Sequence, residues 1–251
     1  MTEALPDAYC FFQEIEPRAP LVARFDRDYL LHAVAGALQV EVEGKRWSLP
    51  SSFAAWVPAD TEMRVTLDRP VTSCSILVKP GKAQGLPDRP TAFQMTRLTR
   101  EMTHHCRAWG KDDPHPPEAA VFFRALLATC AGLMDNAIDV CMPSSDDPAL
   151  SRAIAFTERH IEEALAAEAV AKAAGMSERT MQRRFVAELG ESWGQTLTRI
   201  RMIQAVKLLA LGEMSVIQIA GACGYASISA FNRNFKAYSG LSPSDFKKSI
   251  V

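Results

Sequence analysis

The 251-residue sequence lacks a long hydrophobic run and a secretion-type N-terminus. No apolar stretch approaches the ~18–20 residues that are needed to cross a bilayer, and MTEALPDAYC has no basic start followed by an apolar core. The six cysteines are scattered without a CxxC pair, which argues against a disulfide framework or a zinc finger and favours buried free thiols. These absences predict a cytoplasmic protein without a membrane partner.

Signatures of catalysis are missing as well. The sequence contains no nucleophile elbow and no phosphate-binding glycine loop. His104-His105-Cys106 invites a metal interpretation, but adjacent histidines on a helix point about 100° apart and no further ligand has a clear spacing. The sequence therefore predicts no enzyme, no cofactor and no metal site.

A strong excess of one charge is also absent, because the net charge is −1. This balance conceals an asymmetry between the two parts of the chain. Residues 148–251 carry 13 Lys and Arg against 9 Asp and Glu, whereas residues 1–147 carry 15 against 20. An acidic part joined to a basic part indicates a polyanionic partner for the basic one.

Hydrophobic patterning divides the chain into three segments. Residues 1–90 predict short strands: residues 38–43 alternate between apolar and polar side chains, and turns recur at Pro58, Asp60 and Pro70, as in a small sandwich or barrel. Residues 91–147 are mainly helical and include an apolar face that could pair two chains or pack within one. The loop PSSDDP marks the boundary to residues 148–251, which are almost entirely helical.

An internal repeat lies within residues 148–251. Residues 170–176 (VAKAAGM) match residues 219–225 (IAGACGY), and residues 181–185 (MQRRF) match residues 231–235 (FNRNF). Each copy predicts a short helix with small residues, a turn at Gly175 or Gly224, and a second helix capped by Ser177 or Ser227. This is the design of a helix-turn-helix motif.

The second helix of each copy presents polar side chains away from its apolar pair. Arginine can bond guanine with two hydrogen bonds, and glutamine or asparagine can do the same with adenine. A solvated helix surface would explain one copy equally well, but two copies with matching polar positions weaken that alternative. Residues 195–211 predict a connecting helix of about 25 Å, against the roughly 34 Å between successive major-groove windows. The predicted DNA-reading residues are Arg179, Gln182, Arg183, Ser229, Asn232 and Arg233.

GYASISAFNRNFKAYSGLSPSDF resembles the signature of the AraC/XylS transcription regulators, and AKAAGMSERTMQRRFVAELGES resembles the first motif of the same family. The resemblance covers about 100 residues; Trp193 departs from it, at a position where proline is frequent. It implies an all-α domain of seven helices with two helix-turn-helix units joined by a long helix. It also implies that the six polar residues contact bases in double-stranded promoter or operator DNA, with homodimerisation and RNA polymerase as further expectations.

The first segment looks like the small cupin barrel found in these regulators, which gives an α+β chain of two domains. Cupin enzymes hold a metal with several histidines, whereas this segment has only His32 and places Glu62-Met63 where a histidine often stands. The barrel is expected to hold a small-molecule effector near Trp47 and Trp56, although both could simply belong to the core. Two alternatives stay open: a metal-dependent cupin enzyme fused to a DNA-binding domain, and a ligand-independent regulator whose first half only dimerises.

Overall fold

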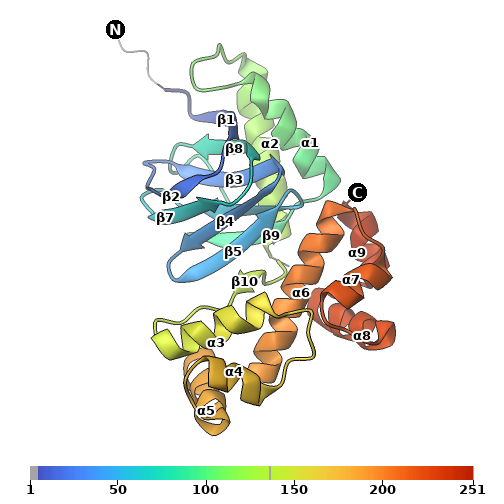
Figure 1. Cartoon of the computed structure of the whole chain (residues 1–251). Helices are drawn as coiled ribbons and strands as arrows, with labels where there is room; N and C mark the ends of the chain where they lie inside the picture. Colours follow the sequence, from blue (N-terminus) through green and yellow to red (C-terminus); the bar gives the residue numbers. More distant parts are fainter. Residues whose placement is uncertain (1–4, 136, 251) are drawn as a thin grey trace. The chain divides into compact units, whose positions relative to one another are not determined.

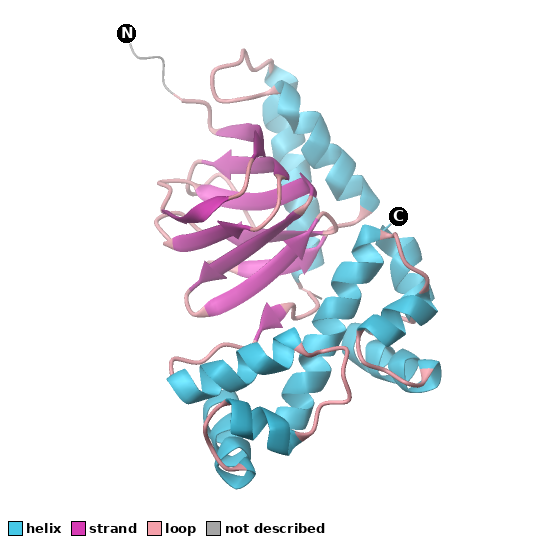
Figure 2. Cartoon of the chain, viewed as in Figure 1, coloured by secondary structure: helices cyan, strands magenta, loops and turns pink. Residues whose placement is uncertain are grey.

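The computed structural model of this chain describes residues 5–135 and 137–250. The chain forms two compact units, one made mainly of residues up to Val140 and the other spanning Cys141–Lys248. The first unit combines strands and helices, whereas the second is helical except for one two-residue strand (Figure 2). This division falls shortly before the loop PSSDDP that the sequence indicated as a boundary.

Two antiparallel sheets form the framework of the first unit. One sheet has the order β1-β8-β3-β6-β9, and the other contains β5-β4-β7-β2 (Figure 1). The strands are β1 (Ala8–Ile15), β2 (Arg18–Ala23), β3 (Asp28–Ala35), β4 (Ala37–Val42), β5 (Lys45–Pro50), β6 (Phe53–Val57), β7 (Met63–Leu67), β8 (Val71–Val78) and β9 (Thr91–Gln94).

The hairpin between β4 and β5 follows from the alternating pattern. Leu38, Val40 and Val42 are buried, while the intervening polar residues are more exposed. Glu43 and Gly44 form the turn, with φ values of 48° and 71°. Two consecutive left-handed residues match the twist of a hairpin, so the turn follows directly after the alternating residues 38–43.

Both faces of the first sheet are covered. On its outer face, side chains such as Leu30, Trp56 and Ile76 belong to a core that also contains residues of two helices. On its inner face, Leu31 and Leu77 border a cavity between the two sheets. The alternation of side chains along each strand therefore gives the sheet two separate apolar environments.

Helices α1 (Arg97–His105) and α2 (Pro117–Met134), with the short 3-10 turn at Cys106–Ala108, cover the outer face (Figure 1). The sequence predicts no span long enough for a bilayer, but α2 is long and apolar enough to cross one by length and composition alone. Phe123, Leu126 and Cys130 of this helix pack against the sheet. Core packing thus accounts for the buried side of α2.

The second unit begins with β10 (Cys141–Met142) and continues with seven described helices. This two-unit arrangement confirms the predicted α+β fold class, with a β-rich part followed by a helical part. The helices are α3 (Pro148–Arg159), α4 (Ala167–Ala173), α5 (Glu178–Leu189), α6 (Trp193–Leu211), α7 (Val216–Ala222), α8 (Ile228–Ser239) and α9 (Pro243–Ile250).

Helix α6 begins two residues before the predicted start at Gln195. Ser192 caps it, because its hydroxyl accepts a hydrogen bond from the Gln195 amide while the Gln195 side chain accepts one from the Ser192 amide. Trp193, the departure from the family pattern, is buried, and its Nε1 donates to the hydroxyl of Thr157 at 3.1 Å. The tryptophan therefore ties the start of α6 to α3.

Candidate nucleic-acid interface

Helices α4 and α5 form the first helix-turn-helix unit. Val170 of α4 and Ala174 at its C-cap are fully buried against Met181 and Phe185 of α5. Gly175 makes the turn with a φ of 73°, a backbone conformation that favours glycine. The hydroxyl of Ser177 then accepts a hydrogen bond from the Thr180 amide and caps α5, as the sequence predicts.

Helices α7 and α8 repeat this arrangement. Ile219 and Cys223 are buried at the positions of Val170 and Ala174, and Phe231 and Phe235 are buried at those of Met181 and Phe185. Gly224 also has a φ of 73°. The hydroxyl of Ser227 accepts from the Ala230 amide at 3.4 Å, so α8 has the expected cap. The repeat in the sequence is thus a repeat in the structure.

The predicted DNA-reading residues lie together on each second helix. Their spacing of three and four residues places them on one side of α5 and of α8. They leave the buried side to the apolar pairs: Gln182 is half-buried, and Arg179, Arg183, Ser229, Asn232 and Arg233 are exposed. No ion pair within the described residues involves Arg179, Arg183 or Arg233. Their guanidinium groups are therefore available to a partner.

Two neighbouring polar residues have structural roles instead. Arg184 of α5 pairs with Asp147, whose side chain also accepts a hydrogen bond from the Ala149 amide at the start of α3. The Ala149 amide, together with the charge of Arg184, holds the pKa of Asp147 below its usual value. Asn234 of α8 donates to the hydroxyl of Tyr225 at 2.9 Å. These contacts hold α5 against the start of α3 and α8 against the second turn.

Sequence reasoning missed a pair of arginines that extends the repeat. Arg152 on α3 and Arg201 on α6 are separated by the same 49 residues as the two turns. Arg152 donates to the carbonyl oxygen of Ala174 at 3.0 Å, beside the first turn. Arg201 packs over the ring of Tyr225, beside the second turn. The common offset of the two arginines was the signal in the sequence.

Arg201 also contacts the segment that precedes the first helix-turn-helix unit. Its guanidinium donates to the carbonyl oxygens of Ile161 and Glu163, at 3.2 and 2.8 Å, in the segment between α3 and α4. Burial is the main cause that lowers the pKa of Arg201. Because Arg201 lies on α6, this connecting helix contacts the segment before α4 and the second turn through one side chain.

The two tryptophans expected near an effector do not lie in one environment. Trp56 belongs to the outer core of the first sheet, where its Nε1 donates to the carbonyl of Pro87 at 3.0 Å. Trp47 is buried in β5 of the other sheet, opposite Val40. The cavity between the sheets measures about 620 Å³ and is lined by other residues, among them Tyr29, Leu31, Leu38 and Met63.

The residues considered for metal binding do not come together as a site. Within the described part of the chain, no group of three or more His, Cys, Asp or Glu residues could hold a metal ion. His104 accepts a hydrogen bond from the Arg107 guanidinium at 3.1 Å, and His105 packs against the ring of Trp109. Five cysteines are buried, and Cys141 is half-buried.

Part of the helical unit matches a known family model, and a longer part of the chain matches a curated protein. Residues 170–249 match the family model described as a helix-turn-helix domain. The HTH-type transcriptional activator RhaS of Salmonella arizonae is 30% identical over 141 residues, which cover 55% of this chain and 49% of that protein. The chain thus spans about half the length of this curated relative.

Two solved structures are also similar to part of this chain. The DNA-binding domain of AdpA, a global transcriptional factor crystallised with a target DNA, is 35% identical over 41% of this chain and 92% of its own, with a TM-score of 0.39. An AraC-type transcriptional regulator from Chromobacterium violaceum is 28% identical over 41% of this chain and 93% of its own, with a TM-score of 0.40.

Proposed function

This chain belongs to the AraC/XylS family of transcription regulators, and we propose that it binds promoter or operator DNA in a sequence-specific manner. The observation that carries the proposal is the pair of matching polar faces on α5 and α8. Each face is exposed, and each is held in place by an apolar pair buried on the opposite side of its helix. Such a helix can enter the major groove while its other side stays anchored in the domain.

The length of α6 fits two reading helices on one face of DNA. Its 19 residues span about 28 Å at 1.5 Å for each residue. Successive major-groove windows lie roughly 34 Å apart. The two helix-turn-helix units extend beyond the ends of α6, so their reading helices can lie farther apart than the length of α6. Arg201 supports this spacing, because it fastens α6 to the segment between α3 and α4 and to the second turn.

The residue types assign different tasks to the two helices. Arg179, Arg183 and Arg233 are suited to guanine, and Gln182 and Asn232 are suited to adenine. Ser229 near the start of α8 can bond a base or a phosphate. The α5 face therefore carries more positive charge than the α8 face, and we expect its binding to depend more strongly on salt.

The first unit is proposed to sense an effector and to form a homodimer. The cavity between its sheets, about 620 Å³ with mainly apolar walls, is within the size range of small-molecule sites. An effector bound there would change how the DNA-binding units of a dimer are arranged. The exposed side of α2, which includes Val121, is the proposed dimer contact, and RNA polymerase is a further proposed partner.

The protein is proposed to act in the cytoplasm and to have no catalytic activity. The alternative of a metal-dependent cupin enzyme predicts bound metal in the purified protein, which elemental analysis would detect. The alternative of a ligand-independent regulator predicts that no small molecule shifts stability or DNA affinity. A ligand screen on the full-length protein separates that alternative from the effector proposal.

Footprinting of the full-length protein on the DNA that flanks its own gene tests the proposed function. We expect protection of two adjacent major-groove windows that survives an increase in salt concentration. Arg183→Ala should weaken one window and Arg233→Ala the other, while Arg159→Ala on α3 should leave both unchanged. Diffuse protection that disappears with salt, in the presence and absence of ligands that stabilise the protein, would overturn the proposal.

A further inference from the structure

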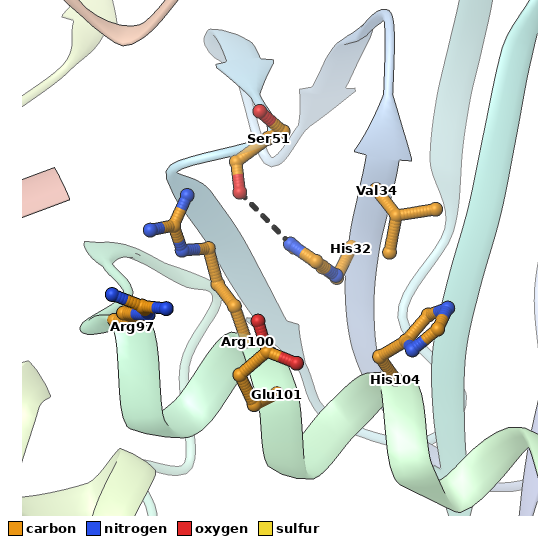
Figure 3. Close-up of a pocket in the computed structure, with 7 residues that line it drawn as sticks. All are labelled: His32, Val34, Ser51, Arg97, Arg100, Glu101 and His104. Atoms are coloured by element: carbon orange, nitrogen blue, oxygen red, sulfur yellow. Dashed lines mark hydrogen bonds between the residues drawn. The ribbon is translucent and has the colours of Figure 1, made fainter. Parts of the chain in front are cut away.

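A second cavity of about 550 Å³ lies outside the two-sheet interior, between the first sheet and α1 (Figure 3). His32 and Val34 of β3 line it from the sheet, and Ser51 lines it from the turn between β5 and β6. Because side chains alternate along a strand, these β3 residues face away from the interior cavity that Leu31 borders. The remaining lining residues are Arg97, Arg100, Glu101 and His104, all on α1.

His32 is the unusual residue in this cavity, because it is 1% exposed and only one ring nitrogen is satisfied. Its Nε2 lies 3.0 Å from the carbonyl oxygen of Ser51. A carbonyl can only accept, so Nε2 carries the hydrogen and Nδ1 is left as an acceptor. Burial lowers the pKa of this ring to about 4, which keeps it neutral near pH 7.

The Nδ1 atom of His32 has no hydrogen-bond partner among the described residues. The nearby Cys74 carbonyl is itself an acceptor and therefore cannot satisfy this lone pair. Figure 3 shows this nitrogen on the side of the ring that faces α1. A buried acceptor without a partner is costly, so a hydrogen-bond donor placed at this point would stabilise the ring.

Helix α1 supplies positive charge to the same cavity. Arg97, Arg100, Glu101 and His104 have the spacing of one helix face. Figure 3 shows the Arg100 guanidinium extending from α1 toward the turn that carries Ser51, with Arg97 near the start of the helix. Burial is the main cause that lowers the pKa of Arg100. Two guanidinium groups outweigh the one carboxylate of Glu101. Paired arginines bind carboxylates with short, charge-assisted hydrogen bonds.

His104 adds a donor at the other end of this face. Its Nε2 lies 3.1 Å from Nη1 of Arg107. A guanidinium can only donate, so Nε2 accepts and Nδ1 of His104 carries the hydrogen in the neutral ring. The cavity thus presents cationic donors along α1 and one unsatisfied acceptor on β3. A ligand that fits both must combine a negative group with a hydroxyl or another donor.

We propose that this cavity binds a small hydroxy-carboxylate, with the carboxylate on Arg97 and Arg100 and the hydroxyl donating to Nδ1 of His32. The volume suits a small organic acid. This site is separate from the interior cavity, and its occupation can be measured without DNA.

Isothermal titration of the full-length protein with paired acids tests this site. The probes are malate, citrate and gluconate, each compared with the matching acid that lacks the hydroxyl groups: succinate, tricarballylate and hexanoate. We expect at least one hydroxy acid to bind saturably below about 10 mM and roughly tenfold more tightly than its partner acid. Arg100→Met should abolish this binding. Arg69→Met, at an exposed arginine between β7 and β8 that does not line the cavity, should leave it unchanged.

A second variant tests His32 without removing its contact with Ser51. In His32→Gln the amide nitrogen can still donate toward the Ser51 carbonyl, but the Nδ1 acceptor is lost. This variant should still bind the carboxylates, yet bind each hydroxy acid no more tightly than its partner. The proposal is overturned if no hydroxy acid binds the wild type saturably, if the hydroxyl makes no difference, or if Arg100→Met binds as the wild type does.

Discussion

Gly175 and Gly224 take the same left-handed backbone conformation at equivalent turns, with a φ of 73° at each. Their surroundings differ. A Cβ atom added at Gly224 would collide with the guanidinium of Arg201 and with the carbonyl oxygen of Ile161. One added at Gly175 would meet only the guanidinium of Arg152, at 4.0 Å. Glycine is therefore required at the second turn by conformation and by space, and at the first by conformation alone.

Alanine substitutions at the two turns should have unequal costs. Gly175→Ala should destabilise the first helix-turn-helix unit by about 1–2 kcal/mol, which is the cost of a left-handed backbone at a residue that has a Cβ atom. Gly224→Ala should cost more, because the Ile161 carbonyl belongs to the backbone and can move only with its segment. Hydrogen exchange of peptides from residues 170–190 and 216–240 measures the two effects separately. If the two variants lost protection equally, the closer packing around Gly224 would have no effect on stability.

Arg233→Ala should weaken binding to the operator by about 1–3 kcal/mol and relax the preference for one base. Arg233 is exposed on α8 and has no ion pair among the described residues, so its loss should leave the fold intact. Binding assays with an operator library, repeated for Arg159→Ala as a control on α3, measure both effects. If all sequences are weakened equally, Arg233 contacts phosphate instead of a base.

Phe235→Ala should unfold the second helix-turn-helix unit. Phe235 is fully buried, and its ring centroid lies 5.9 Å from that of Phe231 and 5.3 Å from that of Phe246. Truncation of such a phenylalanine costs about 3–5 kcal/mol. Hydrogen exchange should show lost protection in residues 216–240, whereas Lys236→Ala at the exposed neighbouring position should retain it. Full protection in Phe235→Ala would show that this aromatic cluster does not hold the unit together.

Much of the helical unit could be predicted from the sequence, because its signals are local. Apolar residues at helical spacing, a glycine at each turn and a serine at each cap occur within about 20 residues of one another, twice. The structure confirms these elements and the exposed position of Arg183 and Arg233. Arg152 and Arg201 could also have been found from the sequence. They are 49 positions apart, like the matched segments, and the comparison of residues at this offset need only begin before residue 170.

The first unit was less predictable, because its sites depend on packing between distant segments. Trp47 and Trp56 are nine positions apart, and the pairing of strands decides that they belong to different sheets. The cavity around His32 requires β3 to lie against α1, whose residues follow about 65 positions later. No local pattern marks His32 as a residue with an unsatisfied nitrogen, since this property arises only from burial and from the Ser51 contact.

The buried ring of His32 should make stability depend on pH. Its pKa is lowered to about 4 in the folded chain, from an ordinary value of 6.5, mainly by burial and further by the charge of Arg100. Between these values the unfolded chain binds a proton that the folded chain does not bind. The contribution of His32 is therefore fully present above pH 6.5 and is lost as the pH falls toward 4. The loss amounts to about 3 kcal/mol at most.

His32→Gln isolates this contribution, because it removes the titrating group and keeps a donor near Ser51. The charged and titratable groups that line the cavity from α1, namely Arg97, Arg100, Glu101 and His104, are the same in both proteins. Chemical denaturation at a series of pH values should show a steeper loss of stability for the wild type than for the variant between pH 6.5 and 4. Parallel curves would mean that His32 titrates equally in the folded and unfolded chains, and that its ring is accessible to water in the folded protein.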